Sequence, residues 1–249
     1  MQSVLPMPID SPWRDWQGHA LIVGGGGIGR ALLEELPLRA PLLQLQLATR
    51  QPRGSNEWRL DLCEDSSLKA LQQQAFTHLQ PLRLVINTAG LLHGPSLQPE
   101  KRLAAISRSQ LLRSFEVNAF GPILLAQAVA DALPRHQNSH FASLSARVGS
   151  IGDNRLGGWY SYRAAKAAQN QLLRTLALEW QRRLPQCCVS LLHPGTTATA
   201  LSEPFRGAVA PSRLFTPPQA AGHLLDVLQG LQADRSGGFW AWDGAAIAW

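Results

Sequence analysis

The chain has 249 residues, of which 45% are hydrophobic and 16% charged, so we expect one soluble globular domain over residues 1–249 with a loose N-terminal extension over 1–18. Its three cysteines, Cys63, Cys187 and Cys188, fit neither a disulfide framework nor a metal-ligand spacing, which predicts a cytoplasmic protein without a metal site. The net charge of +6 comes from scattered arginines, so a nucleic-acid partner is not expected, and no apolar run is long enough to cross a membrane.

The first predicted strand, residues 20–23, is a short apolar run that leads directly into a glycine-rich turn. A helix is predicted from residue 30 to residue 36. A strand, a glycine turn and a helix in this order are typical of a dinucleotide site, because the helix N-terminus and the bare backbone can approach a pyrophosphate. We therefore expect cofactor contacts from Gly24, Gly26, Gly27, Ile28 and Gly29.

The second predicted strand, residues 41–48, indicates which dinucleotide is bound. It ends in Ala48-Thr49-Arg50, without the acidic residue that holds the ribose 2′-hydroxyl of NAD. An arginine here suits a 2′-phosphate, so Arg50, assisted by Arg53, favours NADP(H) over NAD(H). The alternative is an arginine that only faces solvent in a turn.

Two further strands are predicted over residues 57–62 and 82–86, with a helix over 66–79 between them. The alternation of strands and helices predicts an α/β fold, with a single Rossmann-type doubly wound parallel sheet of about seven strands and helices on both faces. Ligands of such sheets lie beyond the carboxyl ends of the strands. Cofactor contacts are therefore expected at these ends from Asp61, Leu62, Asn87, Ala89 and Gly90.

The second half of the chain carries the expected reaction centre. A long amphipathic helix over residues 109–133 contains Asn118, and a fifth strand is predicted over 140–144. A helix over 159–184 places Tyr162 and Lys166 at positions i and i+4, which share one helix face. A lysine cation beside a tyrosine lowers the pKa of the phenol and makes it a usable proton donor. Tyr160 has no such lysine and, with Trp159, is expected to line the substrate wall.

The C-terminal part is expected to close the fold and the site. A sixth strand over residues 187–192 precedes a loop over 193–199, and a last helix (218–231) and strand (238–242) follow. Residues 204–211 are expected to form a mobile segment over the substrate. The aromatic tail is interpreted as core or subunit interface, and it contains Phe239, Trp240, Trp242 and Trp249.

Together these residues resemble the short-chain dehydrogenase/reductase family over nearly the whole chain. The matching segments are the glycine turn, Asp61-Leu62, Asn87-Thr88-Ala89-Gly90, residues 117–121, Tyr162 with Lys166, and Pro194-Gly195 with Thr199. Residues 145–154, 192–196, 201–205 and 238–244 are similar to its C-factor-like branch, which is related to small carbonyl reductases.

The resemblance implies hydride transfer between NADP(H) and a small-molecule carbonyl or alcohol. It also implies that Asn118 helps to hold a water that relays protons to Lys166, and that the protein is a homodimer or homotetramer. Further cofactor contacts are implied in the loop after the sixth strand, at Pro194, Gly195, Thr197 and Thr199.

The sequence departs from the family's pattern in two places. Relatives commonly carry two serines in the segment before the tyrosine, and the second acts on the carbonyl; here Ala146 occupies that position. Ser145 is the favoured donor, with Ser143, Ser150 or no serine as alternatives. The glycine turn is one residue shorter than the family's T-G-x-x-x-G-x-G, so phosphate contacts are expected from backbone N–H groups and Arg30.

Other functions remain as alternatives to an oxidoreductase. A nucleotide-binding signalling or regulatory protein with this fold and little reductase activity is compatible with the two departures. A hydrolase is disfavoured, because the sequence has neither a G-x-S-x-G elbow nor a P-loop. His193 could act as a base, but a histidine packed in the core is the preferred interpretation.

Overall fold

A computed structural model describes residues 11–95, 97–208 and 210–249. In this part of the chain, seven strands form one fully parallel sheet in the order β3-β2-β1-β4-β5-β6-β9. The predicted doubly wound sheet is therefore confirmed. Its strands are β1 (Gly18–Val23), β2 (Leu43–Thr49), β3 (Glu57–Arg59), β4 (Leu82–Asn87), β5 (Ser139–Leu144), β6 (Cys187–His193) and β9 (Gly238–Ala241), and β7 (Thr196–Thr197) pairs separately with β8 (Leu214–Phe215).

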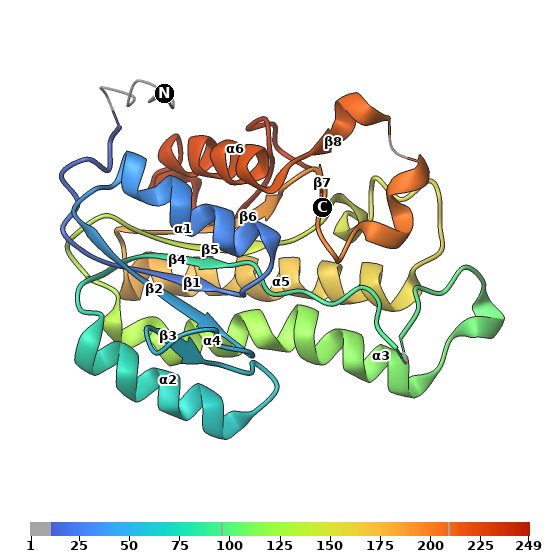
Figure 1. Ribbon diagram of the computed structural model, residues 1–249, viewed down its shortest axis with the longest axis horizontal. Coiled ribbons are helices and arrows are strands. Elements are labelled where there is room, and N and C mark those ends of the chain that lie inside the picture. Colours follow the sequence, from blue (N-terminus) through green and yellow to red (C-terminus); the bar gives the residue numbers. More distant parts are fainter. Residues whose placement is uncertain (1–10, 96, 209) are drawn as a thin grey trace.

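Helices cover both faces of the sheet (Figure 1). One face is covered by α1 (Gly27–Arg39) and α6 (Pro217–Gln229), which pack against each other. The other is covered by α2 (Asp65–His78), α4 (Gly121–Val129) and α5 (Tyr160–Arg183), and α3 (Arg108–Phe115) packs on α5. Apolar side chains fill one cluster on each face. Because both faces are covered, β4 and β5 are buried along their whole length, as expected for parallel strands.

The predicted helix after β3 shows why the apolar spacing was informative. Leu68, Leu71, Ala75 and Leu79 recur every three or four residues, and all four are buried against the sheet. The helix itself runs from Asp65 to His78, and the Leu79 N–H bonds to the Ala75 carbonyl at its end. Sequence periodicity therefore located this element to within one residue at each end.

The helix predicted over residues 109–133 is present as a continuous run of helical turns from Arg108 to Ala132, but its hydrogen-bonding pattern changes along the way. The structure has α3, then a π-helical turn over Glu116–Phe120, then α4 and a short 3₁₀ turn over Ala130–Ala132. Pro122 lies at the start of α4 and has no N–H to donate to the carbonyl four residues earlier, which is that of Asn118. The Gly121 N–H bonds instead to the carbonyl of Glu116, five residues back, which widens the turn at Asn118.

Two other predicted boundaries need correction. The third strand ends at Arg59 rather than Leu62, because the Asp61 carboxylate accepts the Cys63 N–H at 3.0 Å and turns the chain towards α2. At the N-terminus, residues 1–10 of the expected loose extension lie outside the described part. Trp13 is only 2% exposed and joins the cluster under α1 and α6, so this section of the extension is packed rather than loose.

The strand order places a crevice at one point of the sheet. The chain runs outwards from β1 to β3 and then returns to add β4 on the opposite side of β1. Connections on either side of this switch point leave in opposite directions, which opens a crevice beyond the carboxyl ends of β1 and β4. The glycine turn follows β1, and Thr88-Ala89-Gly90 follows β4, so both predicted cofactor segments border this crevice.

Candidate active site

The glycine turn after β1 has the backbone geometry of a phosphate cradle. Gly24 has a φ of +106°, which favours glycine and turns the chain sharply out of the strand. A Cβ on Gly29 would lie 1.9 Å from the Gly24 carbonyl oxygen, so only glycine lets α1 pack this closely on β1. A Cβ on Gly26 would meet nothing within 4 Å, which leaves its backbone open to a ligand. The turn thus follows G-x-G-x-x-G at positions 24, 26 and 29, and it fits a pyrophosphate at the N-terminus of α1.

Arg30, which was expected to assist the phosphate contacts, lines the cavity and is bound to an acid of β3. Its guanidinium forms a two-pronged ion pair with Glu57, at 3.0 Å and 3.3 Å, and its Nε donates to the Gly25 carbonyl. Glu57 also accepts the backbone N–H of Arg53 at 2.9 Å, and these contacts hold the pKa of its carboxyl below the usual range, with the Arg30 hydrogen bonds as the largest cause. Arg30 therefore braces the glycine turn against β3, whereas Arg50 is exposed at the cavity.

One cavity of about 630 Å³ joins the predicted cofactor and reaction residues. Ser145, Tyr162 and Lys166 line the same cavity as the glycine turn. The predicted cofactor residues that also line it are Gly24, Gly26, Gly27, Ile28, Gly29, Arg50, Asp61, Leu62, Ala89, Gly90, Pro194 and Thr199. Four predicted site residues do not line it: Asn87, Asn118, Gly195 and Thr197.

Tyr162 and Lys166 lie together on α5, and both are buried. The Lys166 Nζ lies 5.8 Å from the centroid of the tyrosine ring. Burial raises the pKa of the phenol above its ordinary value and lowers the pKa of Lys166 to about 7. The expected lowering of the tyrosine pKa is therefore wrong for the protein alone, because loss of hydration outweighs the attraction of the ammonium. Tyr162 keeps its proton at neutral pH.

Ser145 is the serine that the fold brings to the cavity. Its hydroxyl donates to the Oδ1 of Asn170 at 2.7 Å, and the residue is 4% exposed. The two alternatives lie elsewhere: the Ser143 hydroxyl accepts hydrogen bonds inside the core, and the Ser150 hydroxyl accepts the Asp153 N–H. To donate to a ligand, Ser145 has to turn its hydroxyl away from Asn170.

Asn118 acts on the loop beside the cavity. Its amide donates to the Leu91 carbonyl at 2.7 Å and accepts the Leu91 N–H at 2.9 Å, so it holds both backbone groups of that residue. Leu91 lines the cavity. Both the donor and the acceptor of the Asn118 side chain are thus hydrogen-bonded. Its backbone carbonyl has no α-helical donor, because residue 122, four positions later, is a proline without an N–H.

The other predicted residues outside the cavity shape its turns. Asn87 donates to the Ser143 hydroxyl and accepts the Ala89 N–H, which fixes the turn after β4. Gly195 has a φ of +73°, and a Cβ there would lie 2.5 Å from the Phe215 ring. Thr197 is 4% exposed. Asn87 and Gly195 therefore fix turns next to residues that line the cavity.

A cluster of aromatic side chains lies beside Tyr162. The Trp159 ring lies 6.3 Å from the Tyr162 ring and 4.9 Å from that of Phe205, which in turn lies 5.8 Å from His93. Phe205 belongs to the segment expected to cover the substrate. Trp159 thus packs against Tyr162, whereas Tyr160 is 40% exposed and forms no stacking pair among the described residues.

One predicted packed histidine and two polar residues that were not predicted lie near the reaction centre. His193 has a pKa lowered to about 4, chiefly by burial, and lies outside the cavity lining, as expected for a packed histidine. Gln169 and Asn170 contact Lys166 and Ser145 respectively, and sequence reasoning missed both. Their positions, seven and eight residues after Tyr162, continue the helix face of Tyr162 and Lys166 and were the available signal.

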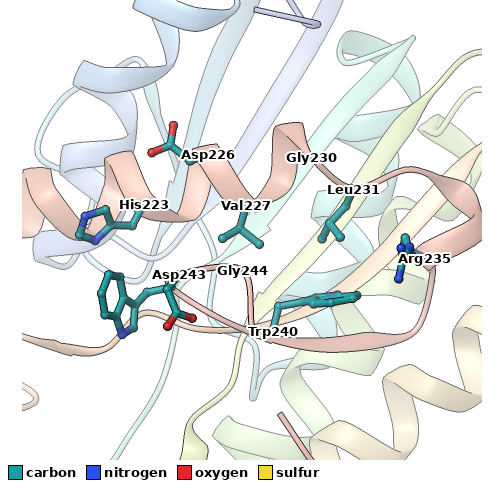
Figure 2. A pocket seen from close by; sticks show the side chains of 10 residues that line it. His223, Asp226, Val227, Gly230, Leu231, Arg235, Trp240, Asp243 and Gly244 are labelled. Carbon is teal, nitrogen blue, oxygen red and sulfur yellow. The ribbon is translucent and has the colours of Figure 1, made fainter. Parts of the chain in front are cut away.

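A second cavity of about 660 Å³ lies between α6 and the end of β9, as Figure 2 shows. His223 and Asp226 on α6 border it, with Trp240 and Asp243 opposite. It shares no lining residue with the cavity at Tyr162, so it is separate from the candidate reaction centre.

Within residues 11–95, 97–208 and 210–249, no three His, Cys, Asp or Glu side chains gather as a metal site. No helix in these ranges is both long and apolar enough to span a membrane.

Comparisons with known proteins agree with this geometry. The family model described as short chain dehydrogenase matches residues 18–209. The 1-hydroxy-2-glutathionyl-2-methyl-3-butene dehydrogenase of Rhodococcus sp. (strain AD45) is 31% identical over 192 residues, which cover 76% of this chain and 78% of that protein. The C-signal protein of Myxococcus xanthus is 30% identical over 148 residues, covering 59% of this chain and 83% of that protein.

Solved structures confirm the fold. The NADPH-bound carbonyl reductase from chicken fatty liver has a TM-score of 0.80 at 24% identity, over 94% of this chain and 100% of that chain. The carbonyl reductase Sniffer of D. melanogaster has a TM-score of 0.76 at 24% identity, over 92% of this chain and 99% of that chain.

Proposed function

Since the chain belongs to the short-chain dehydrogenase/reductase family of oxidoreductases, we propose that it transfers hydride between NADP(H) and a small carbonyl or alcohol substrate. One observation carries the proposal: a single cavity is lined by the glycine turn, by Arg50 and by the Tyr162–Lys166 pair. A dinucleotide lying on the turn would enter the same space that these two side chains border. The cofactor can therefore act on the carbon, and the proton donor on the oxygen, of one carbonyl group.

The proposed preference for NADP(H) rests on the end of β2. Arg50 and Arg53 both line the cavity there, and neither forms an ion pair in the described part of the chain. Glu57, the nearest acid on β3, is neutralised by Arg30 and so repels a phosphate less. A 2′-phosphate at this end would meet guanidinium donors, which bind phosphate well. The chicken reductase of the same fold has NADPH bound, which supports the same choice.

In reduction, the bound nicotinamide supplies hydride to the carbonyl carbon. Residues of the chain donate the proton and stabilise the charge that remains. Tyr162 is protonated at neutral pH and donates to the developing alkoxide, and Lys166, when charged, favours the phenolate that remains. Ser145 turns its hydroxyl from Asn170 to the substrate oxygen. Asn118 fixes Leu91 at the cavity and offers its backbone carbonyl to a relay water.

The proposal is tested first by titrating the purified protein with NADPH and NADH, using the fluorescence of its eight tryptophans. We expect tighter binding of NADPH, followed by oxidation of NADPH when carbonyl compounds are added. Tighter binding of NADH would contradict the cofactor preference alone. Binding of neither nucleotide would contradict the oxidoreductase proposal.

A second candidate function is nucleotide-dependent signalling without significant reductase activity. Its support is the similarity to the C-signal protein and the alanine at position 146, where relatives commonly place a serine. The two candidates differ in turnover, not in binding. Nucleotide binding without oxidation of NADPH by any of a broad carbonyl panel would favour signalling.

We also propose that the protein acts in the cytoplasm as a homodimer or homotetramer. All three cysteines are free, which suits a reducing compartment. Exposed apolar side chains on α3, α5 and the π-helical turn suit subunit contacts, and they include Leu112, Phe120 and Leu178. Light scattering during size-exclusion chromatography measures the assembly directly, and a monomeric mass would contradict it.

A further inference from the structure

A buried amide contacts the lysine of the reaction centre. Gln169 follows Lys166 by three residues on α5 and is 0% exposed. Its Oε1 accepts a hydrogen bond from the Lys166 Nζ at 2.8 Å, and its Nε2 donates to the Ser143 hydroxyl at 2.8 Å and to the Leu144 carbonyl at 3.2 Å. A buried amide is costly unless it is bonded, so both ends of this side chain have defined partners.

The same contacts define the surroundings of the ammonium. A lysine ammonium has three donors, and Lys166 uses two of them, on the Leu144 carbonyl and on Gln169, each at 2.8 Å. Both acceptors are neutral. Lys166 lines the cavity, so the third donor is the one available to a ligand or a water there. Gln169 and the Leu144 carbonyl therefore set the direction in which Lys166 can act.

Tyr162 is the titratable group that faces Lys166 on its own helix, at 5.8 Å from the ring centroid. Among the charged groups on the elements that pack against α5, Arg108 at the start of α3 is exposed, and the others form ion pairs elsewhere; α4 has no titratable side chain. These engaged pairs are Arg147 with Asp153 beside β5 and Arg113 with Glu116 at the end of α3. On β6, burial keeps the Cys187 thiol and His193 neutral at pH 7, with pKa values of about 12 and about 4.

The network continues from Gln169 into the sheet. The Ser143 hydroxyl accepts from Gln169 and also from Asn87 Nδ2, at 3.0 Å. Asn87 in turn accepts the N–H of Ala89, which lines the cavity. Hydrogen bonds thus connect Lys166 on α5 with the cavity turn after β4. Each side chain between them is 0% exposed, so water cannot replace a missing partner without rearrangement.

We propose that Gln169 is a positioning residue of the reaction centre, whose amide oxygen holds the Lys166 ammonium and stabilises its charged form. A hydrogen bond to the charged form of a group favours that form. The residue therefore extends the pH range over which Lys166 is cationic and able to stabilise the Tyr162 phenolate. This role rests on the proposed function, but the contact itself can be tested without turnover.

The chain offers a direct measurement, because its only lysines are Lys69, Lys101 and Lys166. Selective ¹³C labelling of lysine gives three side-chain signals, which Lys166→Met assigns by removing one. Lys69 and Lys101 are exposed and serve as internal references. A pH titration followed by NMR then gives the pKa of Lys166 in the protein without any nucleotide or substrate.

Two variants of Gln169 separate positioning from packing. Gln169→Leu removes the acceptor and is expected to move the Lys166 titration to lower pH. Gln169→Glu supplies a carboxylate and is expected to move it to higher pH, by about 1–3 units. The matched controls are Gln171→Leu and Gln171→Glu, because Gln171 is exposed on the same helix. These controls are expected to leave the Lys166 titration unchanged.

The proposal would be overturned if the two Gln169 variants left the Lys166 titration unchanged or moved it equally in the same direction. A packing role does not predict shifts of the titration in opposite directions. Should Gln169→Leu not fold, Gln169→Met removes the same acceptor with an unbranched chain. The alkaline limb of the pH profile for carbonyl reduction is expected to move with the titration. Shifted titrations in a protein without reductase activity would contradict the proposed function and leave the role of Gln169 intact.

Discussion

The carboxylate of Glu100 accepts hydrogen bonds from both the backbone N–H and the hydroxyl of Ser161. Ser161 lies in the first turn of α5, immediately before Tyr162, and Glu100 is 3% exposed. Trp159, which precedes the helix, has a φ of +52° and offers no side-chain cap, and its N–H bonds to the Glu100 carbonyl. An acid from a distant loop thus caps the helix that carries the reaction centre, where the helix dipole favours a negative charge.

This contact predicts that Glu100→Ala lowers both stability and activity. Loss of the charged acceptor leaves the Ser161 groups unsatisfied, at a cost of about 2 kcal/mol, or about 4–8 °C in Tm. Thermal unfolding monitored by circular dichroism measures the change. Glu179→Ala removes an exposed acid from the same helix and is expected to leave Tm unchanged. Equal Tm values for the two variants would exclude the cap.

The second prediction concerns the proton donor. Tyr162→Phe keeps the ring but removes the hydroxyl, so we expect turnover to fall by about 10²–10⁴-fold while NADPH still binds. Tyr160→Phe is the matched control, because Tyr160 is 40% exposed and is the only other tyrosine in the chain. Steady-state kinetics and the fluorescence titration give the two readouts. Equal turnover of Tyr162→Phe and the unmodified protein would refute the role of Tyr162.

Local spacing explains why much of the fold and site could be predicted. The glycine turn, the apolar face of α2 and the Tyr162–Lys166 pair each depend on residues within a few positions of one another. Glu57 and Glu100 could not be found in this way, because their partners lie 27 and 61 residues away. Their pairing depends on how the strands and loops are arranged in space.

The direction of the Tyr162 pKa shift could not be predicted from the sequence for a different reason. The i, i+4 spacing correctly brought the ammonium near the phenol, but the direction of the shift depends on burial. Burial follows from the packing of α5 against β5 and its neighbours, which spacing along one helix does not contain. Likewise, Pro122 predicts a missing N–H, but the π-helical turn at Asn118 required the surrounding packing.

The third prediction separates two glycines of the same turn. Gly29→Ala would place its Cβ against the Gly24 carbonyl, so we expect loss of folding or a large fall in Tm. Gly26→Ala meets no neighbouring atom and is expected to fold, but its methyl group enters the space for the pyrophosphate. NADPH affinity should therefore fall by about tenfold or more, equivalent to about 1.4 kcal/mol. Unchanged affinity in a folded Gly26→Ala protein would contradict the phosphate cradle.

The fourth prediction tests cofactor preference at the end of β2. Arg50→Ala removes a guanidinium from the cavity, so NADPH affinity is expected to fall by about 10–100-fold, as for loss of a charged hydrogen bond. NADH lacks the 2′-phosphate, and its affinity is expected to stay the same. Arg182→Ala, at the exposed far end of α5, controls for net charge. An equal fall in affinity for NADPH and NADH would show that Arg50 does not bind the 2′-phosphate.

The fifth prediction concerns stability in acid. His140 packs against both Trp13 and Trp16, and burial is the main reason that its pKa is lowered from 6.5 to about 4. Between these values the unfolded chain binds the proton that the folded protein excludes, so stability falls as pH decreases through this window. At pH 4.5 the loss from His140 alone is about 2.5 kcal/mol. His140→Phe keeps an aromatic ring against the two tryptophans and removes this loss, whereas His136→Phe, at an exposed histidine, does not. Urea unfolding at pH 7 and pH 4.5 measures the free energy of unfolding of each variant. If it depends equally on pH in the two variants, His140 is protonated as readily in the folded protein as in the unfolded chain.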